Sequence, residues 1–496
     1  MYRKSHQPSI PPENFELPVA VKLSPDNRWV IMAELIPWAE FEAEYAKKFS
    51  ERMGAPAKPF RMALGALIIK EKLGISDRET VEQIRENPCL QYFIGMSTYS
   101  NEAPFEPSMM VYFRERIALI FVKKINVYMV KDFTDQTEDS EKKNEESELE
   151  ETQNKGKLIL DATATPADIT YPSDLGILNQ ARIQTEKILD SLYKTCQIKL
   201  KKKPRTYRKK AKKAYLKVAK KRRPTRKERR EAIAKQLQYI NRNLSHIEKL
   251  TNSEAELSIL SPRKYKMFLV VTEVYRQQLW MYENESQRID DRIVSISQPH
   301  IRPIVRGKAG KPVEFGAKLS VSYFDQYVFL DRLSWDNFNE SGDLKIQIEE
   351  YKNFTGYYPN SVHVDRIYRT RENRAWCKER GIRISGPPLG RPPKNVSKET
   401  QKQALDDERV RNAIEGKFGQ AKRGYSLNCI MAKLSETAET SIAITFLVIN
   451  LSSLLRQVYC LFLSLLLPRY KLGFIIDIFI NKADIKVFLT TEKLIF

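Results

Sequence analysis

Two apolar runs of strand character, each closed by an aspartate, constrain the fold more than any other feature of this sequence. The runs LILD and VHVD end at Asp161 and Asp365. Short continuous apolar runs are typical of central strands that are buried on both faces of a sheet. Within each run the period of two places Ile159 on the face of Asp161, and His363 on the face of Asp365. The sequence therefore predicts two buried strands, each with a carboxylate at its end.

The long segment between these runs predicts a helical insertion over residues 180–290, followed by a return to strands. One stretch of it has the four-three spacing of a coiled coil. We expect it to pair within the insertion against Tyr265–Leu279, although pairing between two protomers is the alternative. Beyond the insertion, the run PVEFGAKLSVSYFDQYVFLDRLSW predicts two strands with a tight turn near Asp325–Gln326. The coiled-coil positions are Ile233, Leu237, Ile240, Leu244 and Ile247.

Residues 1–131 predict an all-helical N-terminal domain. A helix whose apolar side includes Leu64, Leu67, Ile68 and Leu73 is followed by Gly74, a helix-stop signal. Ser76 and Glu79 have the spacing of a capping box that begins the next helix. This arrangement is similar to a helix-turn-helix, but the second helix is rich in acids, which repel phosphates. A further helix over Met109–Lys124 presents Arg114 and Arg116, which we expect to contact DNA.

Changes in composition divide the rest of the chain. The acidic, apolar-poor residues 132–154 predict a linker. A unit of strand texture then spans 155–179 and 291–456, and residues 457–496 form an apolar tail. Arg456 interrupts the apolar stretch at the end of this unit, so each part is short of the ~20 residues that cross a bilayer. We expect a buried core helix there, no membrane association, and activity that survives truncation after about residue 456.

The charge of the chain favours a nucleic-acid partner over a merely basic soluble protein. Lys and Arg number 84 against 62 Asp and Glu, and 19 of the basic residues lie in 199–230, beside the single acid Glu228. Such clusters bind phosphates with release of counter-ions. The five cysteines form no C-x-x-C pair, which excludes a zinc ribbon. The stretch RGKAGKP lacks the spacing of a phosphate-binding P-loop, so no nucleotide cofactor is expected.

Three acids are candidate ligands of divalent metal ions: Asp161, Asp365 and Glu415. Carboxylates at two strand ends and on a facing helix can hold two ions ~4 Å apart, which activate a water molecule and stabilise a leaving oxygen. Oxygen ligands without a Cys or His cluster select Mg²⁺ or Mn²⁺. From periodicity alone, Asp331 or Asp336 could replace either aspartate. His363 is expected to be a packing or supporting residue rather than a ligand.

Longer stretches around these residues resemble DDE transposases of bacterial insertion sequences, of the IS-five group. The stretches LILDATATPADITYPSDLGILNQAR and HVDRIYRTRENRAWCKERGIRISGPPLGRPPK are similar to the first and second catalytic blocks. The third catalytic block is matched by a further stretch of this chain, RNAIEGKFGQAKRGYSLNCIMAKLSETAETSIAITFLVINL, which resembles it. Arg411, Glu415 and Lys422 fit its signature, whereas Glu408 stands where the family has Tyr. The stretches KPFRMALGALIIKEKLGISDRETVEQI and EPSMMVYFRERI resemble the DNA-binding region of the same group.

The resemblance implies an α/β fold with a ribonuclease-H-like catalytic domain of five strands in the order β-β-β-α-β-α-β-α. The helical insertion interrupts this domain, and the all-α DNA-binding domain precedes it. The resemblance implies that the catalytic, metal-binding acids are Asp161, Asp365 and Glu415. Arg411, Lys422 and Arg423 become phosphate-binding residues, although a solvated basic face is the alternative for the last two.

The function implied by the resemblance is DNA transposition. Such an enzyme binds the terminal inverted repeats of its element, cleaves DNA with two Mg²⁺ or Mn²⁺ ions and joins the freed end to target DNA. Its partners are double-stranded DNA and a second copy of the chain, and its location is the bacterial cytoplasm, in association with the nucleoid. A structure-specific nuclease of the same fold and a non-catalytic DNA-binding protein, such as a decayed transposase, are the alternatives.

Overall fold

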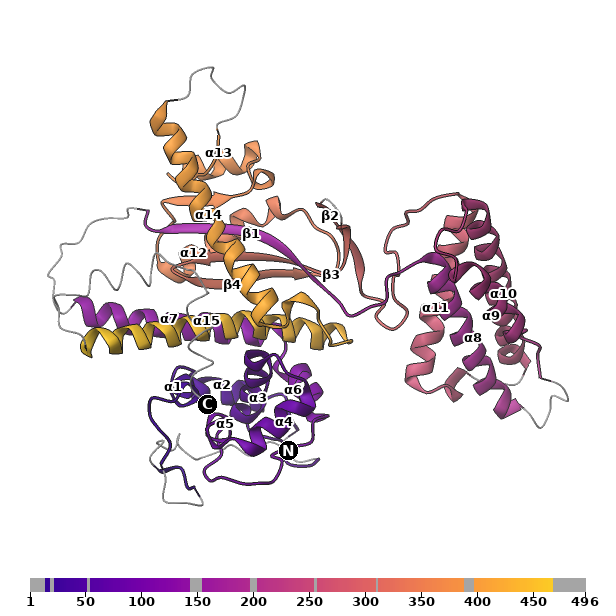
Figure 1. Ribbon diagram of the computed structural model, residues 1–496, viewed down its shortest axis with the longest axis horizontal. Coiled ribbons are helices and arrows are strands. Elements are labelled where there is room, and N and C mark those ends of the chain that lie inside the picture. Colours follow the sequence, from indigo (N-terminus) through magenta and orange to yellow (C-terminus); the bar gives the residue numbers. More distant parts are fainter. Residues whose placement is uncertain are drawn as a thin grey trace.

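The computed structural model describes eight stretches of the chain. A mixed sheet lies at the centre, with small N-terminal helices below it and a separate helical body to its right in the view of Figure 1. Residues 143–153 of the expected linker and residues 467–496 of the expected tail lie outside the described residues. The described stretches are 14–17, 22–50, 54–142, 154–196, 203–253, 257–308, 311–387 and 397–466.

The sheet has six strands in the order β2-β3-β1-β5-β6, with β4 also paired to β3. β1 is antiparallel to β3 and parallel to β5, and β6 continues the parallel part. Five strands were expected; the extra one is β2, which pairs with the first part of β3, whereas β4 pairs with the rest. The strands are β1 (Lys157–Pro166), β2 (Arg302–Lys308), β3 (Lys311–Phe324), β4 (Tyr327–Ser334), β5 (Ser361–Val364) and β6 (Arg383–Ile384).

Local geometry explains two features of this sheet. Asp325 and Gln326 join β3 to β4 with φ values of 48° and 70°, so the tight turn expected there is confirmed. Positive φ at both central residues matches the twist of a two-residue hairpin. Gly316 lies where β3 approaches β1 closely, and a Cβ there would be 2.0 Å from the carbonyl oxygen of Thr165. Any larger residue at this position would push the two strands apart.

Helices cover both faces of the sheet. α14 (Lys398–Gly424) crosses one face, and α12 (Leu344–Thr355) packs on the other. Neighbouring residues of β3 show this: the ammonium of Lys417 on α14 lies 5.8 Å from the centroid of the Tyr323 ring, whereas Phe324 meets Tyr351 of α12 at 4.9 Å between ring centroids. Successive side chains of a strand point to opposite faces. α13 (Arg371–Glu379) and three short 3-10 helices complete this part: Glu340–Gly342, Arg366–Tyr368 and Ser426–Asn428; a fourth, Leu257–Ile259, lies in the helical insertion.

The N-terminal region is helical as far as it is described. Gly74 ends α3 with φ of 66°, and the Ser76 hydroxyl accepts the N–H of Glu79 at 3.1 Å, so the expected helix stop and the Ser76 cap are confirmed. The Glu79 carboxylate accepts a hydrogen bond from Gln83. The helix expected over Met109–Lys124 is instead broken at Ala118, where φ is 55°. The helices are α1 (Arg28–Glu34), α2 (Trp38–Ala46), α3 (Phe60–Leu73), α4 (Asp77–Glu86), α5 (Pro88–Phe93), α6 (Met109–Ile117) and α7 (Leu119–Lys142), the last of which extends into the expected linker.

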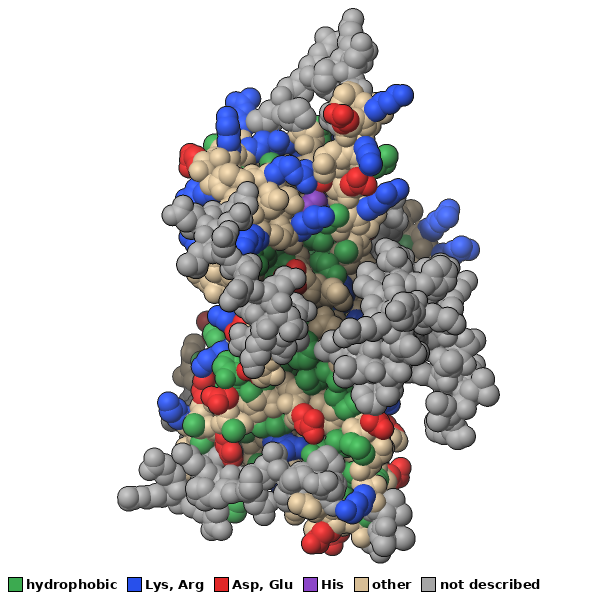
Figure 2. Space-filling view, turned by 90° about the vertical axis from the view of Figure 1, so that its left-hand side faces the viewer, with side chains coloured by type: hydrophobic (Ala, Val, Ile, Leu, Met, Phe, Trp, Pro, Cys, Tyr) green, Lys and Arg blue, Asp and Glu red, His purple; other side chains and the backbone are tan. Residues whose placement is uncertain are grey.

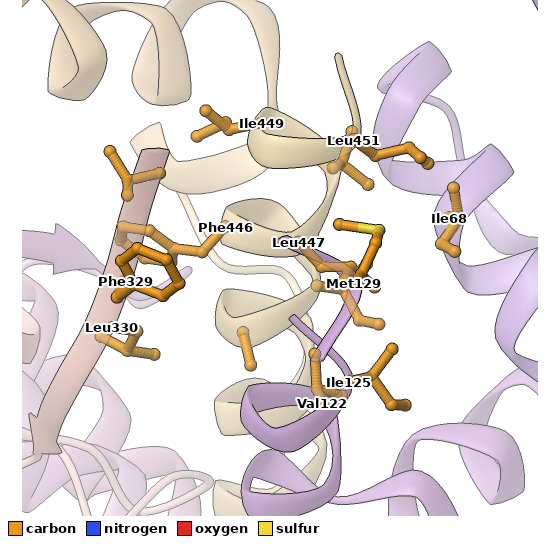
Figure 3. Close-up of a cluster of buried hydrophobic side chains, with 14 of the residues drawn as sticks. Ile68, Val122, Ile125, Met129, Phe329, Leu330, Phe446, Leu447, Ile449 and Leu451 are labelled. Carbon is orange, nitrogen blue, oxygen red and sulfur yellow. The ribbon is translucent and has the colours of Figure 1, made fainter. Parts of the chain in front are cut away.

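These N-terminal helices share one hydrophobic core with the sheet. α7 and α15 (Ser435–Leu466) run side by side between the sheet and the small helices (Figure 1). Figure 3 shows side chains from α3, α7, β4 and α15 meeting in this core. The expected linker therefore does not separate two independent cores. The labelled residues are Ile68, Val122, Ile125, Met129, Phe329, Leu330, Phe446, Leu447, Ile449 and Leu451.

α15 is the one helix in the described residues that is long and apolar enough to cross a membrane. Its window Ser435–Cys460 has a mean hydropathy of 1.6, but 89% of that window is buried inside the protein. It is a core helix, as expected. The helix also passes the expected boundary at residue 456: the Tyr327 hydroxyl donates to Gln457 at 2.7 Å, and the Tyr459 hydroxyl donates to the Asp26 carbonyl at 3.2 Å.

The insertion is a bundle of four helices, set apart from the sheet (Figure 1). It begins at Asp174 rather than at residue 180. The stripe of α10 packs within the insertion, mainly through Leu237, Ile240 and Ile247. The expected partner segment, which lies on α11, packs in the same core through Val271 and Val274, so the internal pairing is confirmed. α8 also packs against the stripe, which the sequence analysis missed, and Leu269 of the expected segment is 51% exposed. The helices are α8 (Asp174–Cys196), α9 (Arg208–Ala219), α10 (Arg226–Ser253) and α11 (Pro262–Glu283).

Candidate functional site

The two strand-end aspartates lie at matching positions of neighbouring strands. β1 and β5 are parallel, and Leu160 is in register with Val364. Asp161 follows Leu160, and Asp365 follows Val364. Both carboxylates therefore lie on the same face of the sheet, one strand spacing apart. β1 continues through Asp161, whereas β5 ends before Asp365. The Asp365 carboxylate there accepts the N–H of Arg366 at 2.6 Å.

α14 brings a third carboxylate and a guanidinium to this face. Arg411 and Glu415 are four residues apart on the helix, and Arg411 Nη1 donates to Glu415 Oε1 at 3.1 Å. Arg411 Nη2 also donates to Glu408 at 2.7 Å. Glu408, which stands where the transposases that this sequence resembles have Tyr, is therefore a partner of Arg411. Its hydrogen bond with Arg411 lowers the pKa of Glu408.

The environment of Asp161 disfavours its ionised form. Burial above all, together with the like charges of Asp365 and Glu415, raises its pKa to about 6. The N–H of Ala162, which donates to Asp161 Oδ1 at 2.8 Å, and the charge of Arg411 act in the opposite direction. The three candidate acids and Arg411 thus interact electrostatically in one site. A carboxyl group with such a pKa in a shared acidic site is typical of functional positions.

The donor set fits a hard divalent cation, but the side chains are not gathered around one point. No group of three or more His, Cys, Asp or Glu among the described residues is placed to hold an ion. One carboxylate oxygen of Asp161 and one of Asp365 each accept the backbone N–H of the next residue. One oxygen of Glu415 accepts a hydrogen bond from Arg411. Carboxylate oxygens are the ligands that Mg²⁺ and Mn²⁺ prefer. Ion binding here requires these side chains to turn toward one another.

Basic groups surround the acids. The Arg369 guanidinium donates to the carbonyl of Val364 at 2.7 Å, directly before Asp365. Burial lowers the pKa of Arg369, and the neighbouring charge of Arg374 lowers it further. The sequence analysis missed Arg369, although the arginine-rich run after VHVD was its signal.

The two remaining basic candidates on α14 lie at its C-terminal end. Lys422 is half-buried and Arg423 is exposed. Lys422 is seven residues after Glu415, so it shares the helix face of Arg411 and Glu415. On the face shown in Figure 2, Lys and Arg gather in the upper half, at the height of α13 and α14 in Figure 1.

The structure overturns the expected DNA contact of Arg114. This side chain is buried and forms an ion pair with Asp77 of α4. Its backbone carbonyl accepts the hydroxyl of Thr440 at 2.9 Å, which ties α6 to α15. Arg116 is half-buried, and its guanidinium lies 4.6 Å from the centroid of the Phe49 ring. The ion pair between Arg114 and Asp77 therefore ties α6 to α4, and Asp77 neutralises the charge of Arg114. The DNA contact expected of Arg116 stays a prediction.

The alternative acids lie outside the site. Asp331 is on the α12 face of the sheet, where the Ser322 hydroxyl donates to it at 2.9 Å. Asp336 is exposed and lies 3.6 Å from Arg302. His363 is buried with its Nε2 at 3.0 Å from the Ser361 hydroxyl, and burial lowers its pKa. His363 is therefore a packing residue, as expected.

Comparison with known proteins adds the family context. The family described as "Transposase DDE domain" matches residues 362–452, which include Asp365 and Glu415 but not Asp161. The family described as "Transposase domain (DUF772)" matches residues 19–116. Two segments of the chain are thus similar to transposase domains, which supports a DDE transposase of insertion-sequence type, and the mixed α/β fold is consistent with such a domain.

One curated relative is similar over a short stretch. A protein of Rhizobium meliloti, described as an uncharacterized protein, ORF8 in the nfe locus, is 36% identical over 95 residues. The match covers 19% of this chain and 45% of that protein, so the chain spans less than half of its relative. No solved structure matches the chain.

Proposed function

We propose that this protein is a transposase of the IS-five group that binds the terminal inverted repeats of its element, cleaves DNA and transfers the freed strand. The observation that carries the proposal is the register of β1 and β5, which sets Asp161 beside Asp365 under the helix that bears Glu415. A sheet with an antiparallel β1-β3-β4 part and a parallel β1-β5-β6 part supports a ribonuclease-H-like catalytic domain.

The three acids would hold one or two Mg²⁺ or Mn²⁺ ions, which supply an activated water and stabilise the leaving oxygen of a phosphodiester. Arg411 fixes the Glu415 carboxylate by a direct hydrogen bond at 3.1 Å. Burial raises the pKa of Asp161 to about 6, because its negative charge is poorly compensated there. A cation bound at the site would compensate this charge. Arg411, Lys422 and Arg423 attract the backbone phosphates on either side of the scissile bond.

The partners in this proposal are double-stranded DNA, both element ends and target, and a second protomer that holds the other end. The basic insertion supplies further phosphate contacts through α9, whose charged residues lie on an ordered helix. Its bundle core is internal, so the insertion does not need another protomer to bury its apolar stripe. We place the protein in the bacterial cytoplasm, associated with the nucleoid.

Substitution of the acids tests this proposal. Asp161→Asn, Asp365→Asn and Glu415→Gln should each retain binding to the DNA that flanks the gene but lose cleavage in Mg²⁺, since amides hold divalent ions poorly. The matched control is Asp406→Asn, because Asp406 is also on α14 but pairs with Arg409 at 3.3 Å. Cleavage at the wild-type rate by any of these variants would show that the substituted acid is not catalytic.

The products of the same reactions separate the alternatives. Cleavage without joining of the new 3′ end would indicate a structure-specific nuclease of the same fold. Binding without cleavage by the wild-type protein, in either metal, would indicate a non-catalytic DNA-binding protein.

A further inference from the structure

Two cations converge on one neutral hydroxyl between α14 and α15. Lys417 Nζ and Arg456 Nη2 each donate to Ser453 Oγ, both at 3.2 Å. Arg456 is exposed, and it is the charge that interrupts the apolar stretch of α15. Neither the proposed metal site nor the hydrophobic core accounts for a guanidinium at this position.

The hydroxyl fixes both cations without compensating their charge. Ser453 Oγ donates its proton to the carbonyl of Ile449 at 3.2 Å, so its two lone pairs remain for Lys417 and Arg456. Within the described part of the chain, no ion pair joins either cation to a carboxylate. Like charges held this close repel each other, and an anion between them would relieve the repulsion.

An aromatic ring borders one of the cations. The ring centroid of Tyr323 lies 5.8 Å from Lys417 Nζ. Tyr323 is in register with Ile159 and so lies on the sheet face of Asp161, two residues away along the strand. The cations therefore lie beside the sheet face that carries Asp161, on the side of α14 that faces α15.

We propose that Lys417 and Arg456 form a phosphate-binding site. An ammonium supplies a point charge and a guanidinium a planar fork, and both donate to phosphate oxygens. The site takes a DNA backbone phosphate if the proposed function holds, and this part of the inference rests on that proposal. The same chemistry accepts inorganic phosphate or pyrophosphate.

The test compares the full-length wild type with Lys417→Gln, Arg456→Gln and the double variant. Arg409→Gln is the matched control, because Arg409 is an exposed arginine of α14 outside this cluster. The first measurement is affinity for duplex DNA against salt in a Glu415→Gln background, which prevents cleavage. The double variant should bind about tenfold or more weakly, and its salt slope should fall by roughly 0.9 for each DNA phosphate that it no longer neutralises.

The second measurement is the melting temperature of each protein without DNA, with pyrophosphate added. Wild type and control should be stabilised, and the double variant should not. Weakened DNA binding together with loss of this stabilisation assigns the site to DNA phosphate; loss of stabilisation alone assigns it to free phosphate. Unchanged behaviour in both measurements by the exposed-site variant Arg456→Gln and by the double variant overturns the proposal. A wild type that binds DNA but never cleaves it would refute the proposed catalysis and leave this site standing.

Discussion

Asp161→Asn should stabilise the metal-free protein while it removes catalysis. Burial and the charges of Asp365 and Glu415 raise the pKa of Asp161 from 3.8 to about 6 in the folded state. An increase of this size costs up to about 3 kcal/mol of folding free energy once the group is ionised. The cost is absent below the unfolded-state pKa, grows between pH 4 and 6, and is fully present above pH 6. Asparagine carries no charge and escapes it.

The assay is thermal unfolding in EDTA at pH 4, 6 and 8. Asp161→Asn should melt several degrees above wild type at pH 8 and together with wild type at pH 4. Asp336→Asn is the control, because Asp336 is exposed and should change neither curve. Mg²⁺ at pH 8 should raise the melting temperature of wild type and leave that of Asp161→Asn unchanged. Equal or lower stability of Asp161→Asn at pH 8, or a gain that persists at pH 4, would refute the reasoning.

Three further predictions concern the insertion and α15. Replacing the Lys and Arg residues of α9 (Arg208–Ala219) with Gln should flatten the slope of log K for DNA against log salt, by roughly 0.9 for each phosphate that the helix neutralises in the wild type; an unchanged slope would mean that the helix does not touch DNA. A fragment of residues 174–283 should be a helical monomer by light scattering, because its apolar stripe is buried internally, and a stable dimer would contradict this. Gln457→Ala should lower the free energy of unfolding by about 1 kcal/mol, because it removes the hydrogen bond from Tyr327, and thermal unfolding measures this change. Truncation after residue 456 should lower the stability further, contrary to what the sequence alone suggests.

Local sequence signals predicted local structure well. Gly74, Ser76 and the Asp325–Gln326 turn each act through their own backbone or the next few residues, so their roles are readable without knowledge of the fold. The break at Ala118 carried no such signal, since alanine favours helix and only packing forces its φ of 55°. The shared core of the N-terminal helices was also missed, because the acidic composition of residues 132–154 says nothing about contacts between the segments on either side.

The candidate site was predicted as far as strand ends and helix spacing could define it. The register of β1 and β5 places Asp161 beside Asp365, and helical spacing places Arg411 beside Glu415. Arg114 shows why the rest could not be predicted: its partner Asp77 is distant in sequence, and only the fold brings the two together. An arginine on an amphipathic helix looks the same whether it binds phosphate or an internal carboxylate.

The most direct measurement locates the divalent ion on the protein itself. Fe²⁺ replaces Mg²⁺ at oxygen-ligand sites, and with ascorbate and peroxide it generates radicals that cut the nearby backbone. The full-length protein should be cut near Asp161, Asp365 and Glu415, with Mg²⁺ competing and with cuts absent from a variant that lacks all three acids. Cuts elsewhere, or the same cuts in that variant, would contradict the claim that these carboxylates form the metal site.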